Sequence, residues 1–359
     1  MSGRRWLAAI LAASLAASGC SSSDGESDSS APLREVQLVP QRSGTDVLLQ
    51  AVSAVDENVA WVSGHGGTWA RTLDGGRTWS AHVMPGADTL QFRDVHALGA
   101  DRAWLLSAGP GELSRIYRTE DGGQTWELQF LNPEPDGFYD CLEFRDAEQG
   151  LVYGDAVDGV LRVLGTRDGG VTWEYARSAD LPAAQSGEGG FAASGTCVAL
   201  GEGGRGWIGT GAADTARVLI TLDGGRTWTA APTPLPGGDA AGIFSLAFRD
   251  SLHGAILGGD LSQPDDPNHG VALTADGGRT WTLSGRPTFV GPVYGTAYVP
   301  GAPTPTLVAV GPKGAAWSAD EGRTWLAADT ASYWGLGIAS RTAGWLVGPG
   351  GRIVRISFE

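Results

Sequence analysis

The chain has 359 residues, of which 42% are apolar, 56 are glycine and 14 are tryptophan, and its formal net charge is −15. This apolar and aromatic content excludes disorder throughout the chain, and glycines without a three-residue period exclude a collagen triple helix. The excess of acidic residues argues against broad nucleic-acid binding, which needs basic surface to neutralise phosphates. We therefore expect a folded protein with a sizeable core and no nucleic-acid partner.

The first twenty residues predict an export signal. Arg4 and Arg5 precede an apolar run over residues 6–17, which is too short to cross a bilayer as a helix. The run ends in Ala17-Ser-Gly-Cys20, which resembles the lipobox of bacterial lipoproteins, although Ala17 stands where leucine is usual. In that family a cysteine placed like Cys20 receives the lipid. The alternative is a plain secretory signal followed by an unrelated cysteine.

Residues 1–19 are therefore expected to be a lipoprotein signal peptide that is cleaved. Residues 20–33 are mostly small and polar, so they cannot bury apolar area and predict a flexible tether. No later apolar run approaches the length of a membrane-spanning helix. The lipoprotein resemblance implies an exported protein held on the periplasmic side of the bacterial cell envelope by its lipid.

One short motif recurs six times in the remaining chain. It reads Thr-Leu-Asp-Gly-Gly-Arg-Thr-Trp in its first copy, and its aspartates are separated by 44 to 55 residues, a period typical of propeller blades or solenoid units. Glycine supplies positive φ angles, and aspartate accepts hydrogen bonds from its own loop, so the motif predicts a tight hairpin. The six aspartates are Asp74, Asp121, Asp168, Asp223, Asp276 and Asp320.

The motif resembles the Asp box, or BNR repeat, which is a structural turn in nearly every family that carries it. Upstream of each copy lie further short apolar segments, and together they predict four antiparallel strands, which make one propeller blade. A seventh repeat ends after three strands. Residues 34–39 have no partner of their own and are expected to supply the missing strand and close the ring. The predicted fold is an all-β, seven-bladed propeller over residues 34–359, with an open solenoid as the alternative.

Aligning the repeats places a column of small residues on the innermost strands, where neighbouring blades crowd around the axis. Two members, Cys141 and Cys197, lie in adjacent blades, and an oxidising compartment would allow a disulfide between them. Two buried free thiols remain the alternative, and no metal-ligand spacing accompanies these cysteines. The column consists of Ala51, Asp94, Cys141, Cys197, Ser245, Ala297 and Gly335.

The repeat supports two functional interpretations. Sialidase-type glycoside hydrolases carry Asp boxes, but their first arginine usually lies in an Arg-Ile-Pro motif that this chain lacks. The chain also resembles the photosystem II stability and assembly factor family, whose repeat combines a Gly-Trp strand start, as at Trp207 and Trp345, with Asp-Gly-Gly boxes. That resemblance implies a non-catalytic, exported scaffold that holds a membrane-protein partner.

The longest loops are expected on the face opposite the Asp boxes, and long loops on a rigid scaffold often carry function. Acidic residues and aromatics near the starts of the innermost strands predict binding of a basic, partly apolar protein or peptide there. The alternative is a solvated acidic rim around aromatics that only pack. The candidate partner-binding residues are Tyr139, Asp155, Asp260, Tyr294, Tyr333 and Trp334.

These patterns together predict a lipid-anchored propeller that binds a protein or peptide partner and assists assembly or stability of a membrane complex. We expect a monomer without a cofactor, a metal site or catalytic residues. A glycoside hydrolase of the sialidase-like class is the alternative function.

Overall fold

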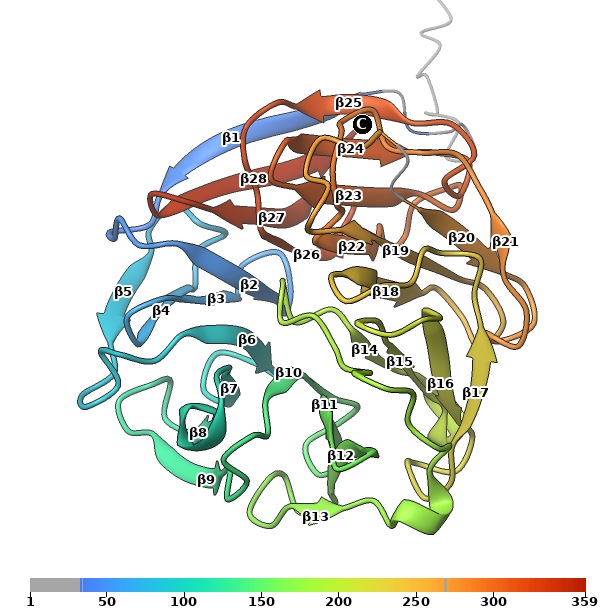
Figure 1. The fold of residues 1–359 in the computed structure, drawn as a ribbon. Coiled ribbons are helices and arrows are strands. Elements are labelled where there is room, and N and C mark those ends of the chain that lie inside the picture. Colours follow the sequence, from blue (N-terminus) through green and yellow to red (C-terminus); the bar gives the residue numbers. More distant parts are fainter. Residues whose placement is uncertain (1–32, 34, 268–269) are drawn as a thin grey trace, which may run out of the picture.

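Seven four-stranded sheets stand around a common axis in the computed structural model, which describes residues 33, 35–267 and 270–359 (Figure 1). The fold is therefore the predicted all-β, seven-bladed propeller. The expected signal peptide, the lipidation of Cys20 and nearly all of the tether lie outside the described residues. The part of the chain that the structure describes contains no helix long and apolar enough to cross a membrane.

Each blade runs from an innermost to an outermost strand in chain order, except the last. Blade 1 consists of β2 Leu49–Ala54, β3 Ala60–Gly64, β4 Thr68–Thr72 and β5 Ser80–Val83. Blade 2 consists of β6 Phe92–Ala97, β7 Ala103–Ser107, β8 Arg115–Thr119 and β9 Glu127–Leu131. Blade 3 consists of β10 Tyr139–Phe144, β11 Gly150–Val157, β12 Val160–Thr166 and β13 Glu174–Tyr175. Blades 4 and 5 are β14 Val198–Leu200, β15 Gly206–Gly209, β16 Arg217–Thr221, β17 Thr229–Pro232; and β18 Ala241–Phe248, β19 Gly254–Asp260, β20 Val271–Thr274, β21 Thr282–Leu283.

Blades 6 and 7 complete the ring. They are β22 Gly295–Tyr298, β23 Leu307–Gly311, β24 Gly314–Ser318, β25 Leu326–Asp329; and β26 Gly335–Ser340, β27 Ala343–Gly348, β28 Arg352–Phe358 with β1 Val36–Arg42. Within the described residues, three single-turn 3₁₀ helices lie between strands: η1 Gly111–Leu113, η2 Ser178–Asp180 and η3 Glu202–Gly204.

The N-terminal strand closes the ring, as predicted. β1 pairs antiparallel with β28 over its whole length, from Val36 opposite Phe358 to Arg42 opposite Arg352. The side-chain oxygen of Gln41 then accepts hydrogen bonds from the indole nitrogens of Trp79 (2.9 Å) and Trp345 (3.2 Å). Since Trp79 belongs to the first blade and Trp345 to the last, a single β1 side chain joins both sides of the closure.

The six Asp boxes form nearly identical turns between the third and fourth strands of blades 1 to 6. In the fourth blade, Asp223 Oδ1 accepts hydrogen bonds from the backbone N–H groups of Arg226 and Thr227, both at 3.0 Å, and Oδ2 accepts one from the Thr227 hydroxyl at 2.6 Å. The Thr221 hydroxyl accepts from Gly225 N at 3.0 Å. Although partial burial opposes it, these hydrogen bonds lower the pKa of Asp223 to about 2, because they stabilise the ionised carboxylate.

Large aromatic side chains fill the spaces between blades. Trp61, Trp104, Trp207 and Trp345 occupy equivalent positions on the second strands and are at most 1% exposed. The indole nitrogen of Trp104 donates to Gly169 O of the next blade's Asp box at 3.0 Å, and that of Trp207 donates to Gly277 O at 2.8 Å. Trp104 and Trp207 thus connect the cores of blades 2 and 4 to the Asp-box turns of the blades that follow them.

Candidate functional site

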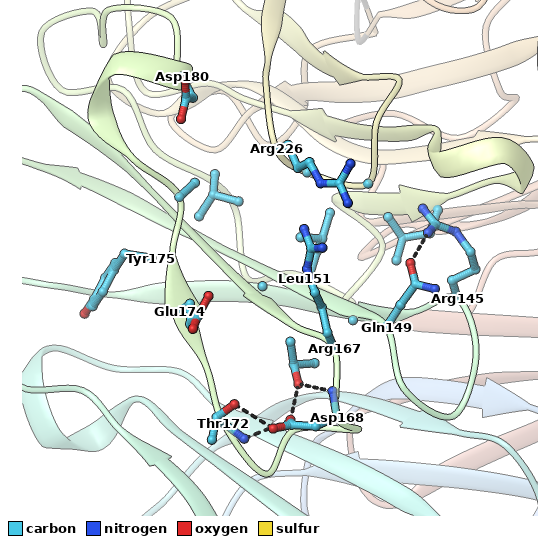
Figure 2. Close-up of a pocket in the computed structure, with 18 of the residues that line it drawn as sticks. Arg145, Gln149, Leu151, Arg167, Asp168, Thr172, Glu174, Tyr175, Asp180 and Arg226 are labelled. Atoms are coloured by element: carbon cyan, nitrogen blue, oxygen red, sulfur yellow. Dashed lines mark hydrogen bonds between the residues drawn. The ribbon is translucent and has the colours of Figure 1, made fainter.

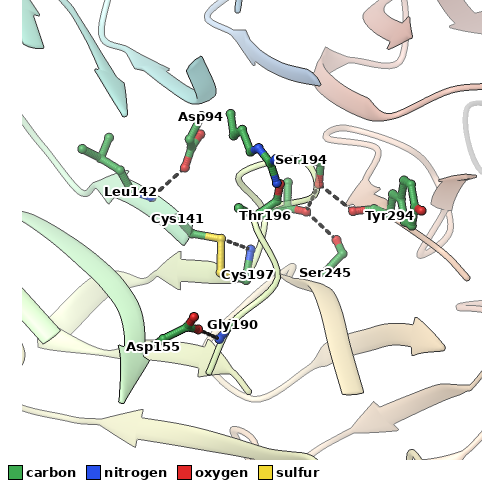
Figure 3. Close-up of a disulfide and its surroundings, with 12 residues drawn as sticks. Asp94, Cys141, Leu142, Asp155, Gly190, Ser194, Thr196, Cys197, Ser245 and Tyr294 are labelled. Atoms are coloured by element: carbon green, nitrogen blue, oxygen red, sulfur yellow. Dashed lines mark hydrogen bonds between the residues drawn. A yellow bond between two sulfur atoms is a disulfide. The ribbon is translucent and has the colours of Figure 1, made fainter. Parts of the chain in front are cut away.

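The predicted column of small residues does lie at the axis, and it contains a covalent link. Cys141 and Cys197 form a disulfide with their Cα atoms 5.8 Å apart, and both residues are fully buried (Figure 3). Other column members accept backbone hydrogen bonds from the next blade: Asp94 Oδ2 from Leu142 N at 2.6 Å, and Ser245 Oγ from Thr296 N at 2.7 Å. The small side chains therefore join blades as well as leaving space.

Two of the residues predicted to bind a partner are buried, which corrects that prediction for them. Tyr139 and Tyr333 have no exposed surface. The Tyr139 ring packs edge-on against Phe130, and its hydroxyl bonds to that of Tyr175 at 3.2 Å. The Tyr333 hydroxyl donates to the Asp329 carboxylate. In both cases the outermost strand of the preceding blade covers the start of the innermost strand, so these aromatics pack the core.

The other four predicted residues do not form one patch. Asp155 accepts a hydrogen bond from Gly190 N at 3.0 Å beneath a loop, and Asp260 accepts from the backbone and hydroxyl of Ser262 in its own turn. Only Tyr294 and Trp334 meet, with ring centroids 4.9 Å apart, and both are half-buried. The structure therefore brings together two aromatic rings and gives both aspartates local hydrogen-bonding roles.

A groove of about 470 Å³ lies elsewhere, between blades 3 and 4, at the Asp-box end of the ring and its outer rim (Figure 2). Its apolar floor includes Leu151 and Val163, whose side chains are almost fully buried. Tyr175, on the two-residue outer strand β13, stands at one wall and is 43% exposed. The groove thus combines an apolar base with the free edge of a short outer strand.

Arginines give the groove its chemical character. Arg145 spans the two blades, donating to Gly201 O at 2.9 Å, to Arg205 O at 3.1 Å and to Gln149 Oε1 at 2.9 Å, so its guanidinium is occupied. Arg167 and Arg226 are exposed, and their guanidinium groups make no hydrogen bond or ion pair with any residue that the structure describes. Two free guanidinium groups in one groove can bind a carboxylate through paired hydrogen bonds.

The acidic residues of the groove are already engaged or lie apart from this pair. Asp168 belongs to the third Asp box, and its carboxylate accepts hydrogen bonds from Thr172 N at 2.9 Å and Thr172 Oγ1 at 2.6 Å. Those bonds lower the pKa of Asp168, so it stays ionised and fixed in its turn. Asp180 lies 3.6 Å from the Arg177 guanidinium. With Arg145 and Asp168 occupied by structural bonds, the groove is better suited to binding than to acid catalysis.

Our sequence reasoning did not identify this groove, although a signal was present. Arg167 and Arg226 occupy variable positions of two successive Asp boxes, directly before Asp168 and directly before Thr227. The box holds both side chains at the same end of neighbouring blades. A basic residue at such positions in adjacent repeats therefore indicates a shared groove, whereas our prediction considered only the opposite face.

Comparisons with known proteins identify the fold. No family model and no curated protein sequence matches the chain. Among solved structures, YCF48 bound to D1 peptide is similar with a TM-score of 0.63 at 16% identity, covering 91% of this chain and 99% of that one. YCF48 from Cyanidioschyzon merolae is similar with a TM-score of 0.63 at 17% identity, covering 90% and 99%.

A third similar structure is a catalytic propeller protein. The GH74 xyloglucanase from Xanthomonas campestris matches with a TM-score of 0.58 at 15% identity, covering 89% of this chain and 53% of that chain. At these identities the likeness establishes the propeller fold, which non-catalytic proteins and hydrolases share. The function must therefore be argued from the groove itself.

Proposed function

We propose that this chain is a non-catalytic propeller that binds a protein or peptide partner in the groove between blades 3 and 4. The observation that carries the proposal is the pair of unengaged guanidinium groups, Arg167 and Arg226, above an apolar floor. Such a site suits an extended segment that presents a carboxylate beside apolar side chains. The propeller fold shared with YCF48 bound to D1 peptide supports a peptide ligand.

The outer strand gives a second means of holding an extended segment. β13 has only two residues, Glu174 and Tyr175, and its outer edge has no strand partner in the sheet order. An extended peptide can add to such an edge through main-chain hydrogen bonds, while the groove selects its side chains. We therefore propose that the partner segment lies along β13 with a carboxylate between the two arginines.

We further propose that the protein is exported, anchored through a lipid on Cys20, and assists assembly or stability of a membrane complex. Leu33, the first described residue, packs in a cluster with Val299 and Phe358 at the Asp-box end. A tether that leaves from this end would orient the groove toward the membrane. Metabolic labelling with a radioactive fatty acid in a bacterial host tests the anchor: the wild type should incorporate label, and Cys20→Ala should not.

A paired-variant experiment tests the groove. The wild type and Arg167→Ala/Arg226→Ala, each immobilised, would capture partners from detergent-solubilised envelopes, and a synthetic peptide from the captured protein would then be titrated by calorimetry. Since charge-assisted hydrogen bonds contribute about 1.5–3 kcal/mol each, the double variant should lose at least about tenfold in affinity.

The matched control is Arg279→Ala/Arg323→Ala. These exposed arginines occupy the position of Arg226 in the boxes of blades 5 and 6, and each donates to a carbonyl of its own turn. The control should bind as the wild type does. Equal affinity for the wild type and both double variants would show that the partner binds elsewhere.

A further inference from the structure

The loop that leaves blade 3 crosses the axis of the ring before blade 4 begins. We name residues 187–196 the axial segment; in Figure 1 it runs through the centre of the ring. It contacts five blades, through Arg93 of blade 2, Asp155 of blade 3, Gly211 of blade 4, Phe244 of blade 5 and Tyr294 of blade 6. These contacts span the ring, so the segment covers its axis.

The contacts at the end of the axial segment are specific. Ser194 Oγ donates to Tyr294 O at 2.6 Å and also bonds to the Thr196 hydroxyl at 2.7 Å (Figure 3). The next residue, Cys197, is the disulfide partner of Cys141. On the Asp-box side, Gly195 and Thr196 form part of the wall of a funnel of about 660 Å³ that the innermost strands surround. Displacing the segment would extend this funnel through the ring.

Two carboxyl groups lie directly beneath the axial segment. Asp140 is 1% exposed, and Asp155 is partly buried. Both carboxyls lie against the same two glycines of the axial segment, since a Cβ on Gly189 would overlap Asp155 Oδ1 and one on Gly190 would overlap Asp140 Oδ2. Asp140 Oδ2 receives no N–H or hydroxyl donor from the described residues, so a proton shared with Asp155 would satisfy it. A hydrogen bond between two carboxyl groups requires a proton on one of them. Asp155, whose Oδ1 accepts from Gly190 N, is then the ionised partner.

Other ionisable groups face this pair from each neighbouring element. Arg93 on β6 lies beside Asp140, but it is held by Gln91 Oε1 and Ala192 O and forms no ion pair with it. The Tyr153 hydroxyl on β11 is buried and has no hydrogen-bond partner among the residues that the structure describes. Glu188 is fully buried in a bidentate ion pair with Arg217 of β16. Of these four groups, Arg93 is therefore the only cation outside an ion pair, and only it could compensate a second negative charge on Asp140 and Asp155.

We propose that the axial segment is a proton-held gate: Asp140 and Asp155 share one proton beneath it, and loss of that proton frees the segment from the axis. The step is a simple ionisation, in which the carboxyl proton of Asp140 passes to water and leaves two carboxylates side by side. Two like charges in a buried site repel, and hydration of both requires the segment above them to move away.

The direction of the pH effect follows from burial. Burial raises the pKa of Asp140 well above its usual range and also raises that of Asp155, with the neighbouring carboxylate adding to the effect on Asp140. The closed form therefore binds one more proton than the open form. Closure is fully favoured at pH values below the usual aspartate pKa and weakens as the pH rises through the raised pKa of the pair.

The disulfide provides a probe of opening. Cys141 and Cys197 are fully buried, so a water-soluble phosphine reduces their bond only when the adjacent axial segment moves away. The rate of reduction of the full folded chain would be measured from pH 5 to pH 9 by mass spectrometry after thiol alkylation. Asp140→Asn mimics the protonated carboxyl, and the rate ratio of wild type to Asp140→Asn should rise at least tenfold over this range.

Two further variants complete the design. Asp155→Asn also removes the second charge and should behave like Asp140→Asn. Asp158→Asn makes the same change at an exposed position in the same blade and should follow the wild type. A ratio of wild type to Asp140→Asn that is constant with pH would overturn the proposal. Failure of both Asn variants at the pair to fold would also overturn it, because a site that holds a proton accepts a neutral isostere.

Discussion

Aspartate side chains have opposite pKa shifts in the Asp-box turns and at the axis of the ring. In the turns, partly exposed aspartates such as Asp168 and Asp223 accept three or four hydrogen bonds, which lower their pKa and keep them ionised. At the axis, Asp94 and Asp140 are buried, and burial raises the pKa of both. The turns are repeated and local, whereas the axial segment is unique and bonds to residues up to 100 positions away. The repeated part builds the ring, and the unique part covers its centre.

Among the changes considered, removing the disulfide should cause the largest loss in the free energy of unfolding. It alters only the axis and leaves the Asp-box turns unchanged. Cys141→Ala/Cys197→Ala opens a loop of 56 residues, and chain entropy predicts a loss of about 4 kcal/mol in the free energy of unfolding. Urea unfolding followed by tryptophan fluorescence measures it. Reducing the wild type should give the same loss, and an unchanged urea midpoint in both samples would contradict the cross-linking role.

Equivalent glycine-to-alanine substitutions in the two regions should differ clearly in how much they lower the free energy of unfolding. Gly195 in the axial segment and Gly224 in an Asp box both have φ near +80°, which strains any other residue by about 1–2 kcal/mol. A Cβ at Gly195 would also overlap the Asp94 carboxyl, whereas one at Gly224 has open space. Gly195→Ala should therefore cost about 3 kcal/mol and Gly224→Ala about 1 kcal/mol. Equal urea midpoints for the two variants would show that the axial segment adapts freely.

Aspartate-to-asparagine changes in the two regions should alter the pH dependence of stability in opposite directions. Of the predicted changes in stability, these should be the smallest. Since the pKa of Asp223 is lowered to about 2, its stabilisation relative to Asp223→Asn is full above pH 4 and is lost as the pH falls toward 2. This partly exposed site should contribute only about 1 kcal/mol. For Asp94, whose pKa is raised, the wild type should match Asp94→Asn at low pH and lose stability relative to it as the pH rises.

Urea midpoints of the wild type and these two variants from pH 2 to pH 9 would check both signs in one series. The Asp94→Asn change keeps an acceptor for Leu142 N, so a large loss at all pH values would point to packing and not to ionisation. Parallel curves for all three proteins would mean that neither carboxyl titrates differently in the folded and unfolded chains.

The blade count, the Asp boxes and the closing strand could be predicted from the sequence, because each depends on a periodic pattern or on one missing strand. Tyr139 and Tyr333 could not be distinguished from surface aromatics, because their burial depends on how far outer strands cover the inner ones. Whether Cys141 and Cys197 are bonded also required the distance between two blades. The axial segment follows no repeat, so its path across the ring appeared only in three dimensions.

The groove shows a different limit of sequence reasoning. Arg167 and Arg226 are 59 positions apart, and although Arg167 directly precedes its box aspartate, Arg226 occupies the same box position as Arg279 and Arg323. What sets them apart is that nearby carbonyls satisfy Arg279 and Arg323 but leave these two free. Such a difference arises from side-chain conformation, which the repeat pattern does not encode.

The pairing of β1 with β28 has a consequence for the order of folding. During synthesis β1 emerges first and β28 last, so the earliest strand must remain without its partner until the entire ring has been made. Six blades can form one after another from neighbouring segments, but the seventh cannot. Ribosome-bound chains that lack β28 would therefore present an unpaired β1 edge, and synthesis of β28 is the event that commits the molecule to its native topology.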